Sequence, residues 1–422
     1  MVSPRLQYSG KLNLGSHGKY DAYKSMLEQE VFPSPQLTTI LCLGLSAPLV
    51  GYFGREFQVP NIIAHLSGDS SSGKTTALKL VATLFGSPVN KEEKNSLLSS
   101  WNMTENALLE MMAGNQGIPI ALDEAGMKKD KSFASLIYRL YEGKDKMRLK
   151  FGEGNTDVRE WHTAIISSGE IPLSDHTDAA TGQGIRFLSF EGVAWTKDAE
   201  HSQRIVEILT ENYGFLGERF VKAVLKTPKE KLQKIYRIEC KKVAQGLKCG
   251  KFNERLAKTI GVVMLACRIL RRMEFPVDAA KCRDFLIDST NQTRGTNNTL
   301  GARAYELLMA EISRHQNQIE RRHGNGGTII PVPSGDVWAV GYGEKSNTKV
   351  KSDTYSFSKV AIQKHDCDRI LEENGFRNPD EVYRQWKTDG FIELGSRGEI
   401  IHKIKFGSVA KAKCIKITMG KL

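Results

Sequence analysis

The segment from Gly68 to Thr76, GDSSSGKTT, has the residue types and spacing of a P-loop, which holds phosphate groups. Its glycines permit a tight turn, and successive backbone N–H groups can then donate to phosphate oxygens at a helix N-terminus. Lys74 is expected to reach the β- and γ-phosphates of a nucleotide, and Thr75 to bind Mg²⁺. The residues predicted to bind nucleotide are Gly68, Asp69, Ser70, Ser71, Ser72, Gly73, Lys74, Thr75 and Thr76.

A second motif is the acidic pair Asp123 and Glu124, which ends the apolar run that starts at Gly117. An apolar run of this kind is typical of a central parallel strand. Asp123 is predicted to hold Mg²⁺ with Thr75, and Glu124 to orient and activate the attacking water. The pair favours hydrolysis over phosphoryl transfer to a small acceptor, although it does not exclude a kinase.

A third predicted strand, residues 163–168, ends in two serines. Ligands bind at the carboxyl ends of parallel strands, so Ser168 or Ser167 is a candidate to contact the γ-phosphate or the attacking water. An ordinary turn at the strand end explains the serines equally well.

Three arginines are candidates to sense or stabilise the nucleotide. Arg186 precedes a fourth predicted strand, 187–190, and is expected to act as an arginine finger supplied by a neighbouring subunit. The alternative for Arg186 is a surface salt bridge. Arg255 is near the start of a predicted helix, 252–273, where its guanidinium can point at nucleotide, and Arg219 competes for that sensing role.

Residues 147–170 include a predicted β-hairpin with polar, basic arms that leads into the buried strand at 163–168. Gly152 and Gly154 are expected to form the turn. The basic residues of its first arm are Lys146, Arg148 and Lys150. The alternative is a solvated surface hairpin without a binding role.

The elements around these motifs predict an α/β fold with a parallel sheet. A helix at 77–85 follows the P-loop, and an apolar helix at 37–53 is predicted to be buried because it is short for a membrane span. Helices at 229–245, 252–273 and 278–289 follow the strands. A helical lid after an α/β core is the layout of an AAA+ ATPase.

The last hundred or so residues change character, and their order predicts a winged-helix-like α+β domain. A helix at 302–322 and glycines at 324, 326 and 327 mark the boundary. Strands are expected at 336–342 and 354–358, helices at 366–374 and 379–388, and a hairpin between 390–394 and 400–405. Whether this domain docks DNA or protein stays open. Its candidate phosphate contacts are Arg384, Lys387, Arg397, Lys403 and Lys405.

The composition allows two or three domains and fits a polyanion-binding protein. The chain has 422 residues with a formal net charge of +12, and a basic excess favours nucleic acid through counterion release. Its seven cysteines include no Cys-x-x-Cys pair, so we expect reduced cytoplasmic thiols and no zinc ribbon. The expected division is 1–45 helical lead-in, 46–195 ATPase core, 196–295 helical lid, 296–325 helical linker and 326–422 C-terminal domain.

The segments GDSSSGKTTAL, LDE, SSGEIPLSDH and GQGIRFLSF together resemble a bacterial ATPase family filed as a domain of unknown function. Members are labelled "superfamily II helicase and inactivated derivatives". They include the replicative helicases of staphylococcal cassette chromosomes and pathogenicity islands, which resemble the minichromosome maintenance (MCM) helicases. The resemblance is best over residues 40–225, weaker through the helical lid, and only a general pattern in the C-terminal region.

The resemblance implies a role for each matching residue. Residues 68–76 match the Walker A loop, and Asp123 with Glu124 matches Walker B. The pair Ser167 and Ser168 falls where MCM-like proteins place a sensor-1 asparagine, so this chain departs from the family pattern at that position. Arg186 matches the finger that acts in trans, and Arg255 matches the sensor-2 arginine by spacing. The hairpin precedes sensor 1, where MCM-like ATPases project a hairpin into the ring channel. This resemblance implies that Arg148 and Lys150, with Lys146 in support, contact the DNA backbone.

The leading hypothesis is therefore a homo-hexameric, ATP- and Mg²⁺-dependent helicase that replicates a mobile genetic element. Its expected partners are single-stranded and forked DNA, other copies of itself and replication proteins of the element, with no membrane. One alternative is an AAA+ initiator or helicase loader that binds a specific DNA site. Another is a nucleotide-gated regulatory or remodelling ATPase that does not act on DNA.

Overall fold

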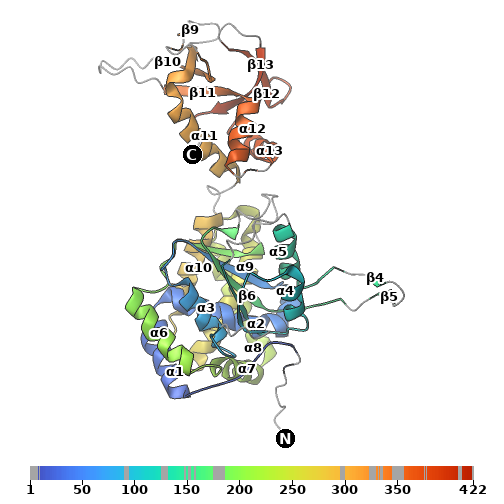
Figure 1. Ribbon diagram of the computed structural model, residues 1–422, viewed down its shortest axis with the longest axis vertical. Helices are drawn as coiled ribbons and strands as arrows, with labels where there is room; N and C mark the ends of the chain where they lie inside the picture. The colour runs from blue at the N-terminus through green and yellow to red at the C-terminus, as the bar shows by residue number, and fades with distance from the viewer. Residues whose placement is uncertain are drawn as a thin grey trace. The chain divides into compact units, whose positions relative to one another are not determined.

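The computed structural model divides the chain into two compact units, Met1–Gly295 and Thr296–Leu422, and each is described by itself (Figure 1). The residues that the structure describes are 8, 10–89, 95–124, 132–146, 149–150, 154–155, 158–173, 186–294, 300–322, 329–330, 332, 336–344, 356–374, 376, 378–406 and 411–420.

A parallel sheet with the strand order β2-β3-β6-β1-β7 forms the centre of the first unit. Its strands are β1 (Ile62–Ser67), β2 (Leu98–Ser100), β3 (Ile120–Asp123), β6 (Ala164–Gly169) and β7 (Leu188–Glu191). Every residue of β1 and β6 is buried, which is typical of parallel strands covered on both faces. A separate antiparallel pair, β4 (Leu149–Lys150) and β5 (Gly154–Asn155), lies away from the body of the unit in Figure 1.

Helices surround this sheet and then continue as a helical segment after β7. They are α1 (Tyr20–Met26), α2 (Pro35–Phe57), α3 (Lys74–Ala82), α4 (Glu105–Met112), α5 (Ser132–Glu142), α6 (Ala199–Glu211), α7 (Leu216–Lys226), α8 (Lys229–Gly246), α9 (Asn253–Arg272) and α10 (Ala279–Arg294). A π-helical segment, Leu27–Val31, follows α1, and a 3-10 turn, Gly250–Phe252, precedes α9.

Helix α2 is the apolar helix predicted from the sequence, and the structure confirms that it is buried. Ser34 caps its start by accepting the N–H of Leu37 at 3.2 Å, and Gln58 ends it in the left-handed conformation with φ of 52°. By length and composition α2 qualifies as a candidate membrane span, but 89% of its apolar window is buried inside the fold. A helix that is apolar on all sides and enclosed by protein is a core helix.

The structure confirms the predicted strands and helices on either side of the Gly-rich segment. β1, α3, β3, β6 and β7 all form close to their predicted positions. Two differences occur in this unit. Strand β2 at the sheet edge was not predicted, because three residues are too short for a pattern. The helix predicted at 278–289 continues further, as α10, to Arg294.

The second unit combines a six-stranded sheet, in the order β12-β13-β11-β10-β8-β9, with α-helices. Its elements are α11 (Leu300–Arg314), a 3-10 turn (Gln316–Gln318), β8 (Ile319–Arg322), β9 (Ile329–Ile330), β10 (Ala339–Glu344), β11 (Ser356–Gln363), α12 (Lys364–Glu373), α13 (Pro379–Asp389), β12 (Ile401–Lys405) and β13 (Lys411–Thr418). Buried side chains of α11, α12, α13 and the sheet form one core.

Two predictions for this unit are wrong. The helix expected at 302–322 ends at Arg314, and Ile319–Arg322 is strand β8, which pairs in parallel with β10. The hairpin expected between 390–394 and 400–405 does not form. Ile392 instead bridges Ile417, while β12 pairs with the earlier part of β13, so both segments follow one edge of the same strand.

Candidate functional site

The Gly-rich loop, residues 68–73, joins the carboxyl end of β1 to the start of α3. Gly68 and Gly73 have φ angles of +139° and +86°, which residues with a Cβ rarely adopt. A Cβ on Gly73 would lie 2.6 Å from Oγ1 of Thr196, and one on Gly68 would lie 3.2 Å from Cα of Gly192. The loop therefore packs tightly against the chain that follows β7.

Lys74 is the first residue of α3, at the helix end that carries partial positive charge. Its Nζ donates hydrogen bonds to the carbonyl oxygens of Gly68 at 2.8 Å and Asp69 at 2.7 Å. The ammonium group thus lies against the loop itself. Ser71 has a φ of +69°, so the loop backbone turns through the left-handed region at three residues.

The other residues of the predicted motif make local contacts. The hydroxyl of Ser72 donates to the carbonyl of Asp69 at 3.0 Å, and that of Ser70 donates to the Glu170 carboxylate at 3.3 Å. Thr76 is buried and shares a 2.6 Å hydrogen bond with Ser202 of α6. Its side chain therefore ties α3 to α6.

Asp123 lies between two hydroxyl groups at the carboxyl edge of the sheet. Oγ1 of Thr75 donates to its Oδ2 at 3.2 Å, and Oγ of Ser168 donates to its Oδ1. The strand order explains this meeting, because β6 lies between β1 and β3 and pairs with both. Lys74, Thr75, Asp123 and Ser168 are thus brought to one edge of the sheet.

Glu124 follows β3 with a φ of +65°, a strained backbone conformation for a residue other than glycine. Its N–H donates to Oδ1 of Asp123 at 3.1 Å, which helps to fix this conformation. The side chain is exposed. The strain is consistent with a functional constraint on the direction of Glu124.

The structure separates the two serines that the sequence left as alternatives. Ser167 is buried, accepts the indole N–H of Trp101 at 2.8 Å and lies 3.0 Å from Nδ1 of His65. Nε2 of His65 lies 3.0 Å from the carbonyl of Ile171, so it carries the proton, and Nδ1 accepts from the Ser167 hydroxyl. Ser167 therefore supports the fold, and Ser168 faces Asp123.

Arg186 and Arg255 both lie at Tyr141, the penultimate residue of α5. Nε and Nη2 of Arg255 donate to the Tyr141 hydroxyl at 3.0 and 2.6 Å. The Arg186 guanidinium lies 4.5 Å from the ring centre of Tyr138 and 6.0 Å from that of Tyr141. Burial raises the pKa of Tyr141 and outweighs the opposing effect of Arg255, so the phenol stays neutral.

The arginine cluster, Arg186 and Arg255 with Tyr141, lies at the amino ends of the strands. The Gly-rich loop lies at their carboxyl ends, which form the opposite edge of the sheet. The Tyr141 carbonyl accepts the N–H of Asn61, just before β1 begins, and Leu188 of β7 pairs with Ala64 of β1. The six residues of β1 span about 20 Å, so Arg186 is too far from the loop of its own chain to contact the same phosphate.

Arg219, the competing candidate, is in a different place. Its guanidinium lies 3.8 Å from the ring centre of Tyr20, at the start of α1. The neighbouring Gly217 donates its N–H to Leu84, just beyond the end of α3 that is remote from the Gly-rich loop. Arg219 is therefore part of neither the loop edge nor the arginine cluster.

A network of buried charges holds the base of the predicted hairpin. The Asp145 side chain is only 3% exposed and pairs with Arg139 at 3.1 Å and with Arg159, whose Nε donates at 3.0 Å. Arg139 also pairs with Glu105 of α4, and Arg159 pairs with Glu110 at 3.3 Å. Both arms of the hairpin are thereby fixed to α4 and α5.

The hairpin itself extends from this base. Asp145 donates its N–H to Arg159 and Trp161 donates to Gly143, and further out Leu149 pairs with Asn155. Lys146 is exposed at the foot of the first arm. Lys150 is in β4, opposite Gly154, and Arg148 lies outside the described residues.

We expect Asp145→Asn to loosen the hairpin base, because it leaves two arginines beside a neutral side chain; breaking a buried pair typically costs about 3 kcal/mol. Burial raises the pKa of Asp145, but the Lys146 N–H, Arg139 and Arg159 outweigh it and hold the pKa below its usual range. This stabilisation should be lost as the pH falls below about 4. Hydrogen exchange across residues 143–161 measures the stability of the hairpin base. These amides should exchange faster in Asp145→Asn than in the unaltered chain at pH 7, and the difference between the two proteins should shrink in acid. Equal exchange at pH 7 would contradict the role of Asp145.

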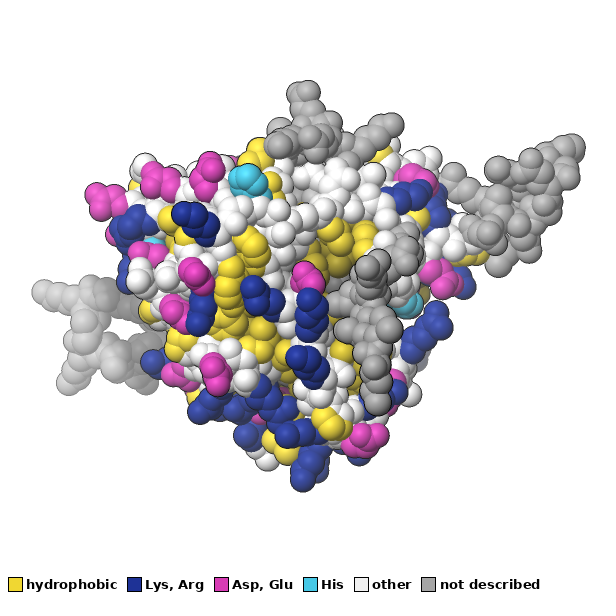
Figure 2. Space-filling model, turned by 90° about the horizontal axis from the view of Figure 1, so that it is seen from below, with side chains coloured by type: hydrophobic (Ala, Val, Ile, Leu, Met, Phe, Trp, Pro, Cys, Tyr) yellow, Lys and Arg dark blue, Asp and Glu magenta, His cyan; other side chains and the backbone are white. Residues whose placement is uncertain are grey.

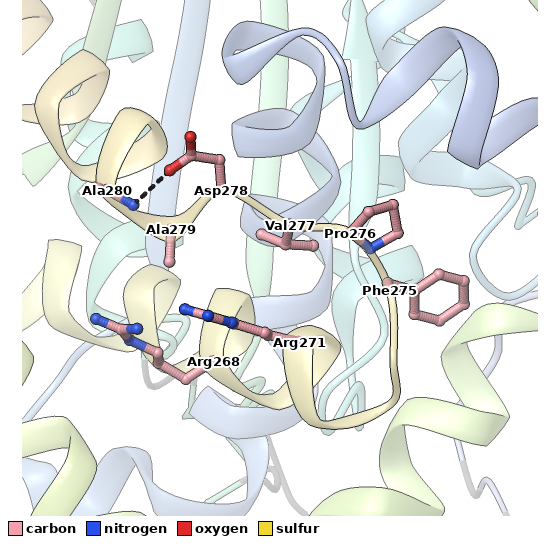
Figure 3. A pocket seen from close by; sticks show the side chains of 8 residues that line it. All are labelled: Arg268, Arg271, Phe275, Pro276, Val277, Asp278, Ala279 and Ala280. Carbon is pink, nitrogen blue, oxygen red and sulfur yellow. Dashed lines mark hydrogen bonds between the residues drawn. The ribbon is translucent and has the colours of Figure 1, made fainter.

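Hollows occur at several places along the helical segment after β7. One of about 580 Å³ is lined by residues that include Arg55, Tyr141, Arg255 and Lys258, so it opens beside the arginine cluster. Another, of about 410 Å³, lies where α9 leads into α10 (Figure 3). There Asp278 accepts the N–H groups of Ala280 and Lys281 at 3.1 Å and caps α10, a structural role.

The loop edge fits a nucleotide with Mg²⁺ by the chemistry of its donors. The described residues contain no group of three or more His, Cys, Asp or Glu that could hold a metal ion alone. The Thr75 hydroxyl and the Asp123 carboxylate are hard oxygen ligands, which bind Mg²⁺ together with substrate phosphates. The two glycine positions leave the backbone room to approach those phosphates.

Sequence reasoning missed Tyr141 and the network at Asp145. Tyr141 lies near the end of an amphipathic helix, where an aromatic residue looks like an ordinary core residue, and it is indeed only 3% exposed. Gly143 was the available signal: its φ is +76°, and a Cβ there would lie 2.4 Å from the Trp161 carbonyl. A glycine that needs a positive φ and has no room for a Cβ marks the residue at which the hairpin begins to extend from the first unit.

Comparisons with known proteins found a matching family model and a solved structure with a similar fold. Residues 5–156 match the model of DUF927, a domain of unknown function. The solved structure "SCCmec type IV Cch - active helicase" has a TM-score of 0.74 with 20% identity and covers 96% of this chain and 71% of that chain. A second match, the C-terminal region of NrS-1, has 12% identity over 68% of this chain and 73% of that chain, and its TM-score of 0.26 supports no shared fold. The comparison with curated proteins found no match. Residues 5–156 therefore match the family filed as DUF927, and the chain shares the fold of the Cch helicase.

Proposed function

We propose that this protein is an ATP-hydrolysing, ring-forming DNA helicase that acts in the replication of a mobile genetic element. One observation carries the proposal. The Gly-rich loop, Thr75, Asp123 and Ser168 meet at one edge of the sheet, while Arg186 and Arg255 meet at the opposite edge. Each edge supplies half of a nucleotide site, so two copies arranged head to tail complete it. The fold shared with an SCCmec helicase supports the same proposal.

At the loop edge, the backbone N–H groups and Lys74 bind the nucleotide phosphates, and Glu124 activates the attacking water. Thr75 and Asp123 would hold Mg²⁺, which would neutralise charge on the phosphates. The Ser168 hydroxyl orients the Asp123 carboxylate in the position where related ATPases place an asparagine. A serine in this position reaches less far, so its effect on the nucleotide passes through Asp123.

At the arginine edge, Arg186 acts as the finger that stabilises charge on the nucleotide of the neighbouring subunit. Arg255 contacts the same nucleotide, and the Tyr141 hydroxyl positions it. Tyr141 is also two residues from Gly143, where the hairpin begins. A shift of the arginines towards a bound nucleotide would therefore pull on the foot of the hairpin of their own subunit.

The basic hairpin contacts one DNA strand in the channel of a homo-hexameric ring. Its base is fixed by Asp145, Arg139 and Arg159, so force on the arms reaches α4 and α5. Basic side chains that follow phosphates bind without reading sequence, as translocation requires. Lys146, Arg148 and Lys150 supply this contact.

Replacing Arg148 and Lys150 by Ala is expected to abolish separation of a forked duplex, because the hairpin would lose its hold on phosphate. ATP hydrolysis without DNA should continue. Lys144→Ala is the matched control, since Lys144 is at the hairpin base and pairs with Glu160 at 3.3 Å. Normal strand separation by the double variant, measured with a labelled fork, would remove the hairpin from the mechanism.

The second unit is proposed to be a winged-helix-like domain that contacts DNA. Helices α11, α12 and α13 pack with β11, β13 and β12, and β13 pairs with both other strands. The five basic residues singled out from the sequence are all exposed: Arg384, Lys387, Arg397, Lys403 and Lys405. Footprinting tests whether this unit recognises a defined site, which an initiator requires and a helicase does not.

A further inference from the structure

Helix α8 is basic on its exposed side, and neither the nucleotide site nor the hairpin accounts for this. Its buried side packs on α9 through Leu232, Tyr236 and Val243. The carboxylate of Glu239 is also buried there, and Nε and Nη2 of Arg268 donate to it at 2.9 and 2.8 Å. That acidic group is therefore already paired inside the fold.

The exposed side of α8 carries a dense positive charge. Its exposed cations are Lys229, Lys231, Lys234, Arg237, Lys241 and Lys242, and Lys248 and Lys251 follow before α9. Glu230 is the exposed carboxylate of this fully described helix. Figure 2 views the end of the first unit where α7 and α8 lie in Figure 1, and Lys and Arg side chains gather along one edge of that face.

Three of these cations form a stripe. Lys234, Arg237 and Lys241 are three and four residues apart, so they lie on one face of the helix. With Gln233, Ile238 and Glu230 they line a shallow hollow of about 400 Å³. Among the described residues, no carboxylate forms an ion pair with any of the three. Cations that are unneutralised and held in a row by a rigid helix are suited to a row of phosphates.

The face also lacks the feature that single-stranded DNA needs. Proteins that bind single strands stack bases on exposed aromatic rings. The one aromatic residue of α8, Tyr236, points inward and stacks on Phe57 with ring centres 4.2 Å apart. A straight row of cations without a stacking surface fits the regular backbone of a duplex.

We propose that the exposed face of α8 is a second nucleic-acid site, which binds duplex DNA through its phosphates without reading sequence. This inference rests on the proposed function, in which the hairpin holds a single strand. The face of α8 would hold duplex that is not yet separated, outside the channel. Lys234, Arg237 and Lys241 are the residues that define this site.

The test uses the full-length chain and a fluorescent duplex whose two ends are closed by loops, which offers no free end to thread into a ring. Binding is followed by anisotropy between 50 and 200 mM salt. The triple variant Lys234→Ala, Arg237→Ala, Lys241→Ala should bind about tenfold more weakly, and the slope of log affinity against log salt should fall by about 3. Thermal unfolding confirms that the variant is folded.

The matched control replaces Arg271, Arg272 and Lys281, three exposed cations near the junction of α9 and α10. It should bind the closed duplex like the unaltered chain. The inference is overturned if the triple variant keeps the affinity and the salt slope of the unaltered chain. It is also overturned if light scattering shows that the triple variant has lost self-association while its DNA binding is unchanged. Failure of the unaltered chain to bind the closed duplex would overturn it as well. Lys74→Ala, which tests the proposed ATPase, should leave this binding intact, so the two proposals fail separately.

Discussion

Mixing Lys74→Ala subunits with Arg186→Ala subunits is expected to restore ATP hydrolysis that neither variant performs alone. Lys74→Ala disables the loop edge of a subunit and leaves its arginine edge intact. Arg186→Ala does the reverse, and loss of an arginine finger typically lowers the rate by about 10³- to 10⁵-fold. In a random mixture at equal amounts, about one quarter of the interfaces combine two intact edges, so about a quarter of the original rate should return.

This expectation follows from the separation of the two edges within one chain. Arg186 lies with Tyr138 and Tyr141 near the start of β1, whereas the Gly-rich loop follows its end. Light scattering must show that mixed rings form. Mixed rings that stay inactive would contradict action in trans. Arg219→Ala provides the control, because Arg219 lies over Tyr20 and its loss should leave hydrolysis intact.

Glu124→Gln is expected to lower ATP hydrolysis by about 10²- to 10⁴-fold while ATP still binds. The amide keeps the size of the carboxylate but cannot accept the proton of the attacking water. The backbone of Glu124 is already held by Asp123, through the 3.1 Å bond from its N–H, so the substitution should not move the loop. A fluorescent ATP analogue measures binding, and phosphate release measures hydrolysis.

Glu170→Gln is the control for this experiment. Glu170 is another exposed carboxylate at the loop edge, where it accepts a hydrogen bond from Ser70 at 3.3 Å. It has no role in activating water, so hydrolysis should change little. A normal hydrolysis rate in Glu124→Gln, or an equal loss in both variants, would remove Glu124 as the base.

The loop edge was largely predictable from the sequence, because each part of it is local. The glycines at 68 and 73 adopt positive φ angles, and Lys74 begins α3 as the motif predicts. Buried parallel strands read as unbroken apolar runs, so β1, β3 and β6 were found without knowledge of their partners. The hairpin was predicted because polar and apolar residues alternate in its first arm, two glycines follow, and the buried run at 163–168 comes directly after it.

The strand order was not predictable, since pairing between distant segments leaves no local pattern. It decides that β6 lies beside both β1 and β3, and so that Ser168 rather than Ser167 contacts Asp123. It also places Arg186 and Arg255 together at Tyr141. From the sequence alone, nothing connected Tyr141 to the two arginines.

The errors in the second unit have a similar cause. Residues 315–322 continue a helix-favouring composition after α11, but Ile319–Arg322 forms a strand because β10 and β9 pair with it. The glycines at 395 and 398 indicated a hairpin turn. The loop between them instead interrupts one edge of the sheet, because Ile392 and β12 both pair with β13.

The rate of ATP hydrolysis with and without single-stranded DNA, on a sample whose mass is determined by light scattering, tests the central claim most directly. A ring-forming helicase should have the mass of a hexamer, hydrolyse ATP faster when single-stranded DNA is added, and separate a forked duplex under the same conditions. A monomer that hydrolyses ATP at the same rate with and without DNA would contradict the account.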